Sequence, residues 1–388
     1  MKLFHISDLH IGKQLHFYNL RDNQLEILIQ VVDRAKEQHP DAIIIAGDIY
    51  DKSVPSAEAY TVFDKFLNDL SDITPSISVM IIAGNHDSAE RLSYASSFLE
   101  KHNIYISVLP PQTEEEHLKK VVLKDKYGPV NFYLLPFTKP GYVRHLFEEG
   151  SITGYDKAIS ALIDREQINY SERNILISHQ FYVSGEMIPE TCDSEQVYLS
   201  VGGVDSVDIA SIIQFDYVAL GHLHGPQHIG RRNIRYSGTP LKYSVSEEKH
   251  VKSVTMVTIG EKGEEISIDK LPLAAIQDVR KEKGTLSEII SRATPENRHD
   301  FISITLTDEA DIYKPKEQLE EYYDSILEVK VENSRTKVQL ENAISEASVL
   351  DPFEAFKEFY QEINCEPINN NEEKIMIEII DKVKGAED

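Results

Sequence analysis

Five short blocks of metal-binding residue types lie within the first 225 residues of the chain. They are SDLHIG (7–12), GDIYD (47–51), GNHDSAERL (84–92), ISHQ (177–180) and GHLHG (221–225). Carboxylate and amide oxygens together with imidazole nitrogens suit divalent ions such as Mn, Fe or Zn. Hydrolysis by two such ions needs donors from several loops and a carboxylate that bridges ions about 3.5–4 Å apart. The blocks therefore predict a dinuclear metal centre.

Each block taken singly has a plain structural explanation. Asp8 or Asp48 could cap a helix or stabilise a loop, and His10 could be an ordinary hydrogen-bonded histidine. His222 and His224 could flank a turn. Five ordered blocks of the same chemistry are a much rarer coincidence, which favours the metal centre. The other nine histidines lack this context and are interpreted as surface or structural residues: 5, 16, 39, 102, 117, 145, 228, 250 and 299.

Each block follows an apolar run that predicts a strand: LFHI (3–6), AIIIA (42–46), VMIIA (79–83), NILI (174–177) and YVAL (217–220). In α/β folds ligands bind outside the carboxyl ends of the strands, so the five loops are expected to converge on one site. The glycines at 47, 84 and 221 are expected to let the chain turn sharply beside the metals.

Helical patterns separate these strands. Predicted helices cover Asp22–Gln38, Ala57–Leu70 and Ala89–Lys101, and the first should bury Leu25, Leu28, Ile29 and Val32. Continuous apolar strands that alternate with helices predict a layered α/β fold with sheets covered on both faces. Residues 1–272 are therefore assigned to one domain that holds the blocks.

The pattern of predicted helices and strands changes after about residue 273. Helices near 286–292 and 315–323 and strands at 301–306 and 326–331 predict a small α+β domain over 273–347. Residues 348–388 hold two amphipathic segments separated by INNNEE, the first opening with Asp351-Pro352. Their apolar faces carry Phe353, Phe356, Tyr360 and Ile363 in the first, and Ile375, Ile379 and Val383 in the second.

These two segments have two interpretations. They either pack on their own domain or dock as a helical pair onto a coiled coil of a partner.

The composition limits the partners and the cell compartment. A net charge of −25 argues against a chain that grips nucleic acid by itself, although bound cations or a basic partner could change the local sign. Two cysteines outside any CxxC pattern, no signal peptide and no apolar run near 20 residues predict a cytoplasmic protein. No GxxxxGK[ST] motif occurs, so any ATP would be bound by a partner.

In this order the motifs DLH, GDIYD, GNHD, SHQ and GHLH resemble the calcineurin-like metallophosphoesterase superfamily over about residues 1–260. More narrowly the chain resembles the SbcD family, the nuclease subunits of bacterial SbcCD complexes. That resemblance rests on AGDIYDKSVPS (46–56), GNHDSAERL (84–92), LLPF (134–137), YSGTPLKYSVSE (236–247) and Phe-x-x-Phe-x-x-Phe-Tyr (353–360). It implies a sandwich of two sheets flanked by helices, a capping domain for DNA specificity over 273–347 and a partner-docking segment over 348–388.

The resemblance also implies a role for each site residue. Asp8, His10, Asp48 and His224 would hold one ion, and Asp48, Asn85, His179 and His222 the other, with Asp48 bridging. Mn²⁺ would be the working metal. His86 would be the general acid or orient the leaving group, with fixing Asp48 as its alternative role. At residue 51 this chain has Asp where archaeal and eukaryotic relatives carry His, so the role of that His is not carried over.

The function implied is a metal-dependent DNA nuclease, exonucleolytic on double strands and endonucleolytic on single strands and hairpins. It would act in repair, recombination and replication as a homodimer with the ATPase SbcC in a heterotetramer. The alternative is a phosphodiesterase or phosphatase for small molecules or phosphoproteins. Such phosphatases show GDxxDRG and GNHE, whereas this chain has GDIYDKS and GNHD. A degenerate, non-enzymatic scaffold is disfavoured because the ligand set is intact.

Overall fold

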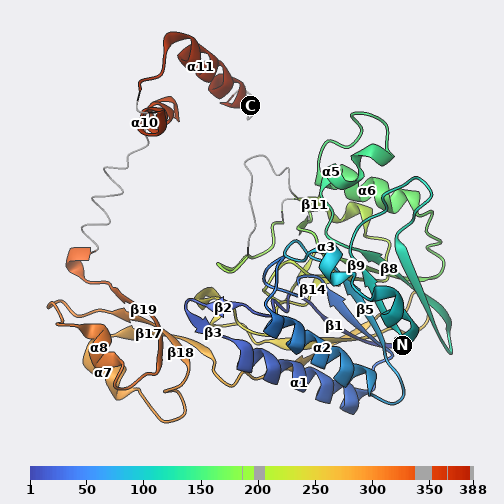
Figure 1. Ribbon diagram of the computed structural model, residues 1–388, viewed down its shortest axis with the longest axis horizontal. Coiled ribbons are helices and arrows are strands. Elements are labelled where there is room, and N and C mark those ends of the chain that lie inside the picture. The colour runs from blue at the N-terminus through green and yellow to red at the C-terminus, as the bar shows by residue number, and fades with distance from the viewer. Residues whose placement is uncertain (186, 196–205, 337–351, 365, 385–388) are drawn as a thin grey trace. The chain divides into compact units, whose positions relative to one another are not determined.

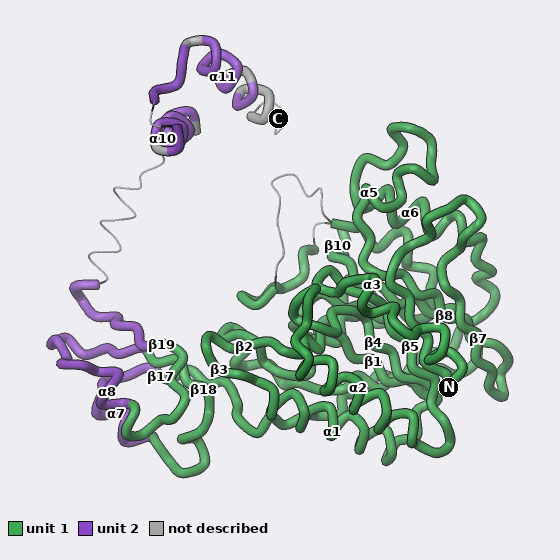
Figure 2. Tube along the Cα trace, viewed as in Figure 1, with its two compact units in different colours: residues 1–282, 293–304, 320–328 green, residues 283–292, 305–319, 329–388 purple. Residues whose placement is uncertain are grey.

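The structure is a computed structural model that describes residues 1–185, 187–195, 206–336, 352–364 and 366–384 (Figure 1). Its chain divides into two compact units (Figure 2). The first consists of 1–282, 293–304 and 320–328, and the second of 283–292, 305–319 and 329–388. All five motif blocks belong to the first unit.

The first sheet of that unit has six strands in the order β16-β15-β1-β4-β5-β6. The bounds are β1 Lys2–Ile6, β4 Ala42–Ala46, β5 Ser78–Ile82, β6 Ile104–Ser107, β15 Ser253–Thr258 and β16 Ser267–Pro272. The four strands β1, β4, β5 and β6 run parallel, whereas β15 and β16 pair antiparallel at one edge. Helices α1 (Arg21–Gln38) and α2 (Ala57–Ser71) form the connections between β1, β4 and β5.

The second sheet has the order β13-β14-β12-β9-β8-β7. Its bounds are β7 Lys119–Asp125, β8 Gly128–Leu135, β9 Arg173–Ser178, β12 Tyr217–Leu220, β13 Gln227–Ile229 and β14 Arg231–Tyr236. Strands β8, β9, β12 and β14 are parallel, and the outer strands β7 and β13 are antiparallel to their neighbours. Helix α6 (Tyr155–Arg165) packs its buried residues Ile159 and Leu162 against this sheet.

Strand β4 shows how the layers are built. All five of its residues are buried, because the two faces of a strand present alternate side chains to different layers. Ile43 and Ile45 join the core with α1 and α2, while Ile44 joins Phe132 and Ile177 in the core between the two sheets. The prediction of an α/β fold with two sheets flanked by helices is therefore confirmed.

The shorter elements of the chain complete the inventory. Near the sheets lie β2 Gln14–Leu15, β3 Tyr18–Asn19, α5 Pro140–Val143, η2 Arg144–Leu146, β10 Tyr182–Val183, β11 Val207–Asp208, η3 Ile209–Ser211 and η4 Val245–Glu247. A three-stranded sheet of order β17-β18-β19 contains β17 Val279–Gly284, β18 Phe301–Leu306 and β19 Ser325–Val331, with helices α7 Leu286–Ser291 and α8 Pro315–Leu319. Helix α8 ends four residues before the predicted end at Tyr323.

Helices α10 (Pro352–Asn364) and α11 (Asn370–Lys384) form at the two amphipathic segments. Asp351, predicted to help start the first of them, lies outside the described residues. Of the helices in the described ranges, none has both the length and the apolar composition that crossing a bilayer requires.

The buried face of α1 differs from the predicted one. Ile29 is 40% exposed, whereas Ile27 and Val31 are buried. The buried residues follow pairs such as Ile27–Leu28 and Val31–Val32, and Ile29 falls outside that stripe on a 3.6-residue helix. The spacing predicted the helix correctly but placed one of its apolar residues on the wrong side.

The helix predicted over Ala89–Lys101 is wrong as a single element. The structure has α3 (Ala89–Leu92), α4 (Ser96–Leu99) and the 3-10 helix η1 (Glu100–His102) instead. Ala95 adopts a left-handed conformation with φ of 59°, which a continuous right-handed helix does not allow. The break leaves Tyr94 83% exposed.

Candidate metal centre

The structure brings together all eight residues that the sequence analysis singled out. Backbone hydrogen bonds tie the blocks directly to one another at the strand ends: Asp8 N donates to Gly47 O (3.0 Å), His10 N to Asp48 O (3.0 Å) and Gly221 N to Ser178 O (3.1 Å). The amide of His222 also donates to the Asp8 carboxylate at 3.0 Å. The carboxyl ends of parallel strands from both sheets thus meet at one place, as the strand pattern predicted.

Four of these residues have unusual backbone conformations. Asp8, His10, Asp48 and His222 have φ values of 54°, 41°, 50° and 99°. Residues other than glycine rarely adopt positive φ, and each instance costs of order 1–3 kcal/mol. Such strain gathers at functional sites because the surrounding structure holds the side chains in place. Its occurrence at four predicted ligands supports a functional centre.

Asp48 occupies the middle of this cluster. Its Oδ1 accepts a hydrogen bond from the His86 amide at 2.9 Å. Its Oδ2 lies 3.3 Å from His179 Nε2 and 3.7 Å from His10 Nε2. One oxygen is therefore held by the main chain, while the other faces imidazoles on two sides.

The side chain of Asn85 completes one half of the cluster. Its Oδ1 lies 3.2 Å from His179 Nε2 and 3.1 Å from His222 Nδ1. His179 donates its Nδ1 proton to the carbonyl of Ala46 at 2.7 Å, so its Nε2 atom faces the cluster. Asp8 Oδ1 lies 3.9 Å from the same Nε2 atom.

A metal ion fits the donors present. Both ring nitrogens of His10 are buried without a hydrogen-bond partner, an arrangement that costs free energy unless a ligand satisfies them. Among the described residues three groups place potential ligand atoms within 4.8 Å of one another: Asp8/His10/His224, Asp8/Asp48/His179 and His10/Asp48/His86. The first two groups contain five of the seven expected ligands. The third shows that His86, expected to be a non-ligand, also lies within reach of an ion.

Burial sets the protonation of the imidazoles. It lowers the pKa of His222 to about 3 and depresses the pKa of His10 and of His224 as well. At neutral pH these rings are uncharged and keep a lone pair, which is the form that binds metals.

The two carboxylates and His179 lie close enough together to shift one another's pKa values. Burial raises the pKa of Asp8 to about 8. Burial would also raise the pKa of Asp48, but the imidazoles of His179, His10 and His86 together outweigh burial and hold this pKa well below its usual value. Burial lowers the pKa of His179, but the Asp48 and Asp8 carboxylates and the Ala46 carbonyl together outweigh burial and raise it to about 9. Two buried carboxylates side by side favour a site that gains positive charge, and divalent cations supply it.

Aromatic side chains wall the cluster. The Phe137 ring, from the LLPF motif, lies 6.4 Å from the rings of both His179 and His222. Tyr243 lies 5.6 Å from the His10 ring and 6.1 Å from the His224 ring. These rings place apolar surface beside the cluster, and charges interact more strongly next to apolar groups than in water.

Several residues near the expected ligands were not assigned a role from sequence. Asp87 accepts hydrogen bonds from the amides of Ile49 (3.1 Å), Tyr50 (3.0 Å) and Gly84 (2.9 Å), so it shapes the loop that carries Asp48. The sequence signal that could have identified Asp87 is its position in the GNHD motif. Two further residues, Ser194 and Glu247, lie beside His224. Glu247 ends the YSGTPLKYSVSE motif, whereas nothing in the sequence marked Ser194.

Glycines act at this site in two different ways. Gly47 has a φ of 89°, in the left-handed region expected for a sharp turn. Gly84 does not require positive φ; a Cβ there would lie 2.1 Å from Asp48 Oδ1. Gly84 is therefore needed for its close approach to Asp48 and not for a left-handed conformation.

Gly84→Ala should displace the Asp48 carboxylate and weaken metal binding by about 10- to 100-fold, the range for lost ligand support. Titration calorimetry with Mn²⁺ measures this. Gly141→Ala is the matched control, because a Cβ at Gly141 meets nothing within 4 Å. Equal Mn²⁺ affinity in both variants would contradict the close packing of Gly84 on Asp48.

Comparison with known proteins identifies two family regions. The calcineurin-like phosphoesterase family matches residues 1–226, and the family described as type 5 capsule protein repressor C-terminal domain matches residues 275–364. The SbcD subunit of the nuclease SbcCD from Staphylococcus epidermidis is 34% identical over 330 residues, which cover 84% of this chain and 84% of that protein.

Two solved structures show distant likeness. A dimetal phosphatase from Danio rerio has a TM-score of 0.42 at 12% identity, covering 70% of this chain and 98% of its own. GAP50 of Plasmodium, described as the anchor in the inner membrane complex, has a TM-score of 0.38 at 13% identity, covering 71% and 89%.

Proposed function

We propose a function from one premise: this chain belongs to the calcineurin-like phosphoesterase family and, within it, to the SbcD family of nuclease subunits. It is a hydrolase of phosphoester bonds that uses divalent metal ions. Its substrate is DNA, which it cuts from double-strand ends and within single strands and hairpins. It does so with an SbcC-type ATPase in DNA repair, recombination and replication. The relationship to a nuclease subunit over most of both chains disfavours the small-molecule phosphoesterase alternative.

One observation supports metal-dependent hydrolysis of phosphoesters most strongly. The buried Asp48 carboxylate lies between His10 on one side and His179 on the other, with Asn85 and Asp8 beside them. We assign Asp8, His10, Asp48 and His224 to one ion, and Asp48, Asn85, His179 and His222 to the other. The donor set fits Mn²⁺, the ion proposed here as the working metal.

The bound ions would supply Lewis-acid charge that stabilises the phosphoryl oxygens and activates water. The protein residues fix where that charge acts. Main-chain amides hold Asp8 and Asp48, and the Ala46 carbonyl orients His179. His86 donates its Nδ1 proton to the Asp51 carbonyl at 2.8 Å. In its imidazolium form the ring would carry a second proton on Nε2, and that proton would go to the leaving oxygen.

Asp48→Asn should lower Mn²⁺ affinity by more than about 100-fold, because the bridging charge is lost. His86→Ala should keep both ions, because the amide of residue 86, not its ring, holds Asp48. Cleavage of a labelled hairpin duplex should fall about 100- to 10,000-fold in His86→Ala, the usual contribution of a general acid.

Metal content and single-turnover cleavage, measured on the same samples, separate these roles. Full Mn²⁺-dependent cleavage by His86→Ala would exclude the acid assignment. Loss of an ion in His86→Ala would make His86 a ligand, as its distance to His10 and Asp48 allows.

The acidic net charge of −25 fits a subunit that binds DNA through its metals and its partner. We assign partner docking to residues 348–388 and a DNA-specificity role to 273–347. Phe359 and Ile363 of α10 are 58% and 62% exposed, and Ile375 and Ile379 of α11 are 58% and 47% exposed. Amphipathic helices with exposed apolar residues of this kind suit a coiled-coil partner.

Phe359→Ser with Ile363→Ser should abolish pull-down of the SbcC-type ATPase, because the apolar contact area is lost. Gln361→Ser, a change at an exposed position of the same helix, is the control and should retain pull-down. The Mn²⁺-dependent cleavage of a generic phosphodiester should be the same in both. Undiminished pull-down by the double variant would refute the docking role.

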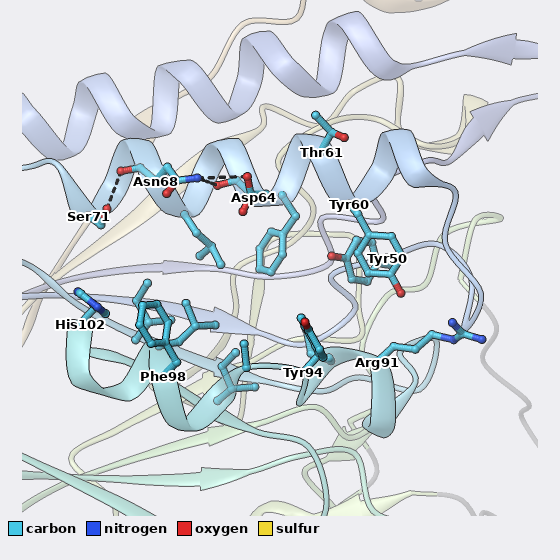
Figure 3. Close-up of a pocket in the computed structure, with 17 residues that line it drawn as sticks. Tyr50, Tyr60, Thr61, Asp64, Asn68, Ser71, Arg91, Tyr94, Phe98 and His102 are labelled. Atoms are coloured by element: carbon cyan, nitrogen blue, oxygen red, sulfur yellow. Dashed lines mark hydrogen bonds between the residues drawn. The ribbon is translucent and has the colours of Figure 1, made fainter.

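We also propose that the chain forms a homodimer through the face built by α2, α3 and α4. A groove of about 650 Å³ opens there, lined by apolar residues such as Tyr60, Leu67, Leu99 and Ile104 (Figure 3). Tyr94 and Phe98 at this groove are 83% and 61% exposed. Clustered exposed aromatics on the surface of a domain mark interaction sites, and the family resemblance implies a second copy as the occupant.

Phe98→Glu should shift the protein from dimer to monomer in sedimentation velocity, because it places a charge in the interface core. Phe17→Glu, the same change at a residue 95% exposed outside this groove, should remain dimeric. A monomeric native protein at micromolar concentration, or a dimeric Phe98→Glu, would contradict this interface.

A further inference from the structure

We propose that Ser194 and Glu247 are positioning residues that select the tautomer of His224 and aim its Nε2 atom at the metal. The inference deepens the proposed function, since it rests on His224 being a metal ligand. Neither residue belongs to the five motif blocks. Ser194 comes from the segment 187–195, which follows β10 and reaches the ring of His224.

Glu247 is a fully buried carboxylate with a dense set of partners. Its Oε2 accepts from the Lys252 ammonium at 2.6 Å and from Thr239 Oγ1 at 3.2 Å. Its Oε1 accepts from Ser194 Oγ at 2.7 Å, from Ser244 Oγ at 3.0 Å and from the Tyr243 amide at 3.1 Å. A buried charge is tolerated when it is paired and hydrogen-bonded in this way.

The carboxylate determines the direction of the next hydrogen bond. An ionised carboxylate only accepts, so the hydroxyl proton of Ser194 points at Glu247. Ser194 Oγ lies 2.6 Å from His224 Nδ1 and must therefore accept there. His224 then carries its proton on Nδ1, and its Nε2 keeps the lone pair that binds a metal.

The main chain of His224 is held by the same group of residues. Its carbonyl accepts from Lys252 Nζ at 3.1 Å and from the Thr239 amide at 3.2 Å. Its amide donates to the carboxylate of Glu195. Lys252 also donates to Thr239 Oγ1 at 2.6 Å, so its three protons all have acceptors. Ring and backbone of one ligand are thus fixed from two directions.

A metal-bound histidine commonly donates the N–H of its second ring nitrogen to a carboxylate. Loss of that carboxylate lowers metal affinity by about 10- to 100-fold. Here the effect passes through a serine from a different segment. The Asp193 amide donates to Ser246 Oγ at 2.9 Å, which fastens that segment to the residues around Glu247 without touching His224. Ser246→Ala is therefore a control: it removes this attachment of the segment but leaves the hydroxyl of Ser194 beside His224.

The experiment measures Mn²⁺ affinity by titration calorimetry on the full chain. Ser194→Ala should weaken one of the two ions by about 10- to 100-fold and leave the other unchanged. Ser194→Thr should restore affinity, and its near-isostere Ser194→Val should not, because the two differ in the hydroxyl. Ser246→Ala should bind both ions as the native protein does.

Native affinity for both ions in Ser194→Ala and Ser194→Val would overturn the inference. Equal weakening in Ser194→Thr and Ser194→Val would also overturn it, because shape rather than the hydroxyl would then matter. Failure of the proposed function looks different: the native protein would bind fewer than two ions, or His224→Ala would bind two with native affinity.

Discussion

The negative charge of Asp48 is buried at the point where the carboxyl ends of strands from two sheets meet. A lone carboxylate in that position is costly, and its neighbours reduce the cost in two ways. The His86 amide binds one oxygen, and imidazoles from both sides face the other. The positive φ values of Asp8, His10, Asp48 and His222, the close approach of Gly84 and the amide contacts of Asp87 all serve this one arrangement. Divalent cations complete it.

Further residues surround and support the proposed ligands. Main-chain groups hold Asp8, Asp48 and His179, and a relay through Ser194 to Glu247 holds His224. Glu247 is itself paired with Lys252 in the interior. A charge network of this kind adds little net stability compared with apolar packing, but it fixes one geometry. That fixed geometry is what a reaction between accurately placed ions and a phosphate needs.

Much of the fold and of the site follows from sequence. Apolar runs that end in residues of metal-binding type predicted both the strands of an α/β fold and the convergence of their loops, because ligands in such folds bind outside the carboxyl ends of the strands. Local patterns were less informative where tertiary contacts decide. The break at Ala95 and the exposure of Ile29 depend on which surface each residue meets. Ser194 lies in a segment without apolar periodicity, and only the folded chain places it beside His224.

Anomalous diffraction at the manganese absorption edge, from crystals of the native chain grown with Mn²⁺, tests the dinuclear centre most directly. We expect two peaks that share the Asp48 carboxylate, one beside His10 and His224 and the other beside Asn85, His179 and His222. A single peak, or two peaks that do not both contact Asp48, would contradict a centre bridged by this residue.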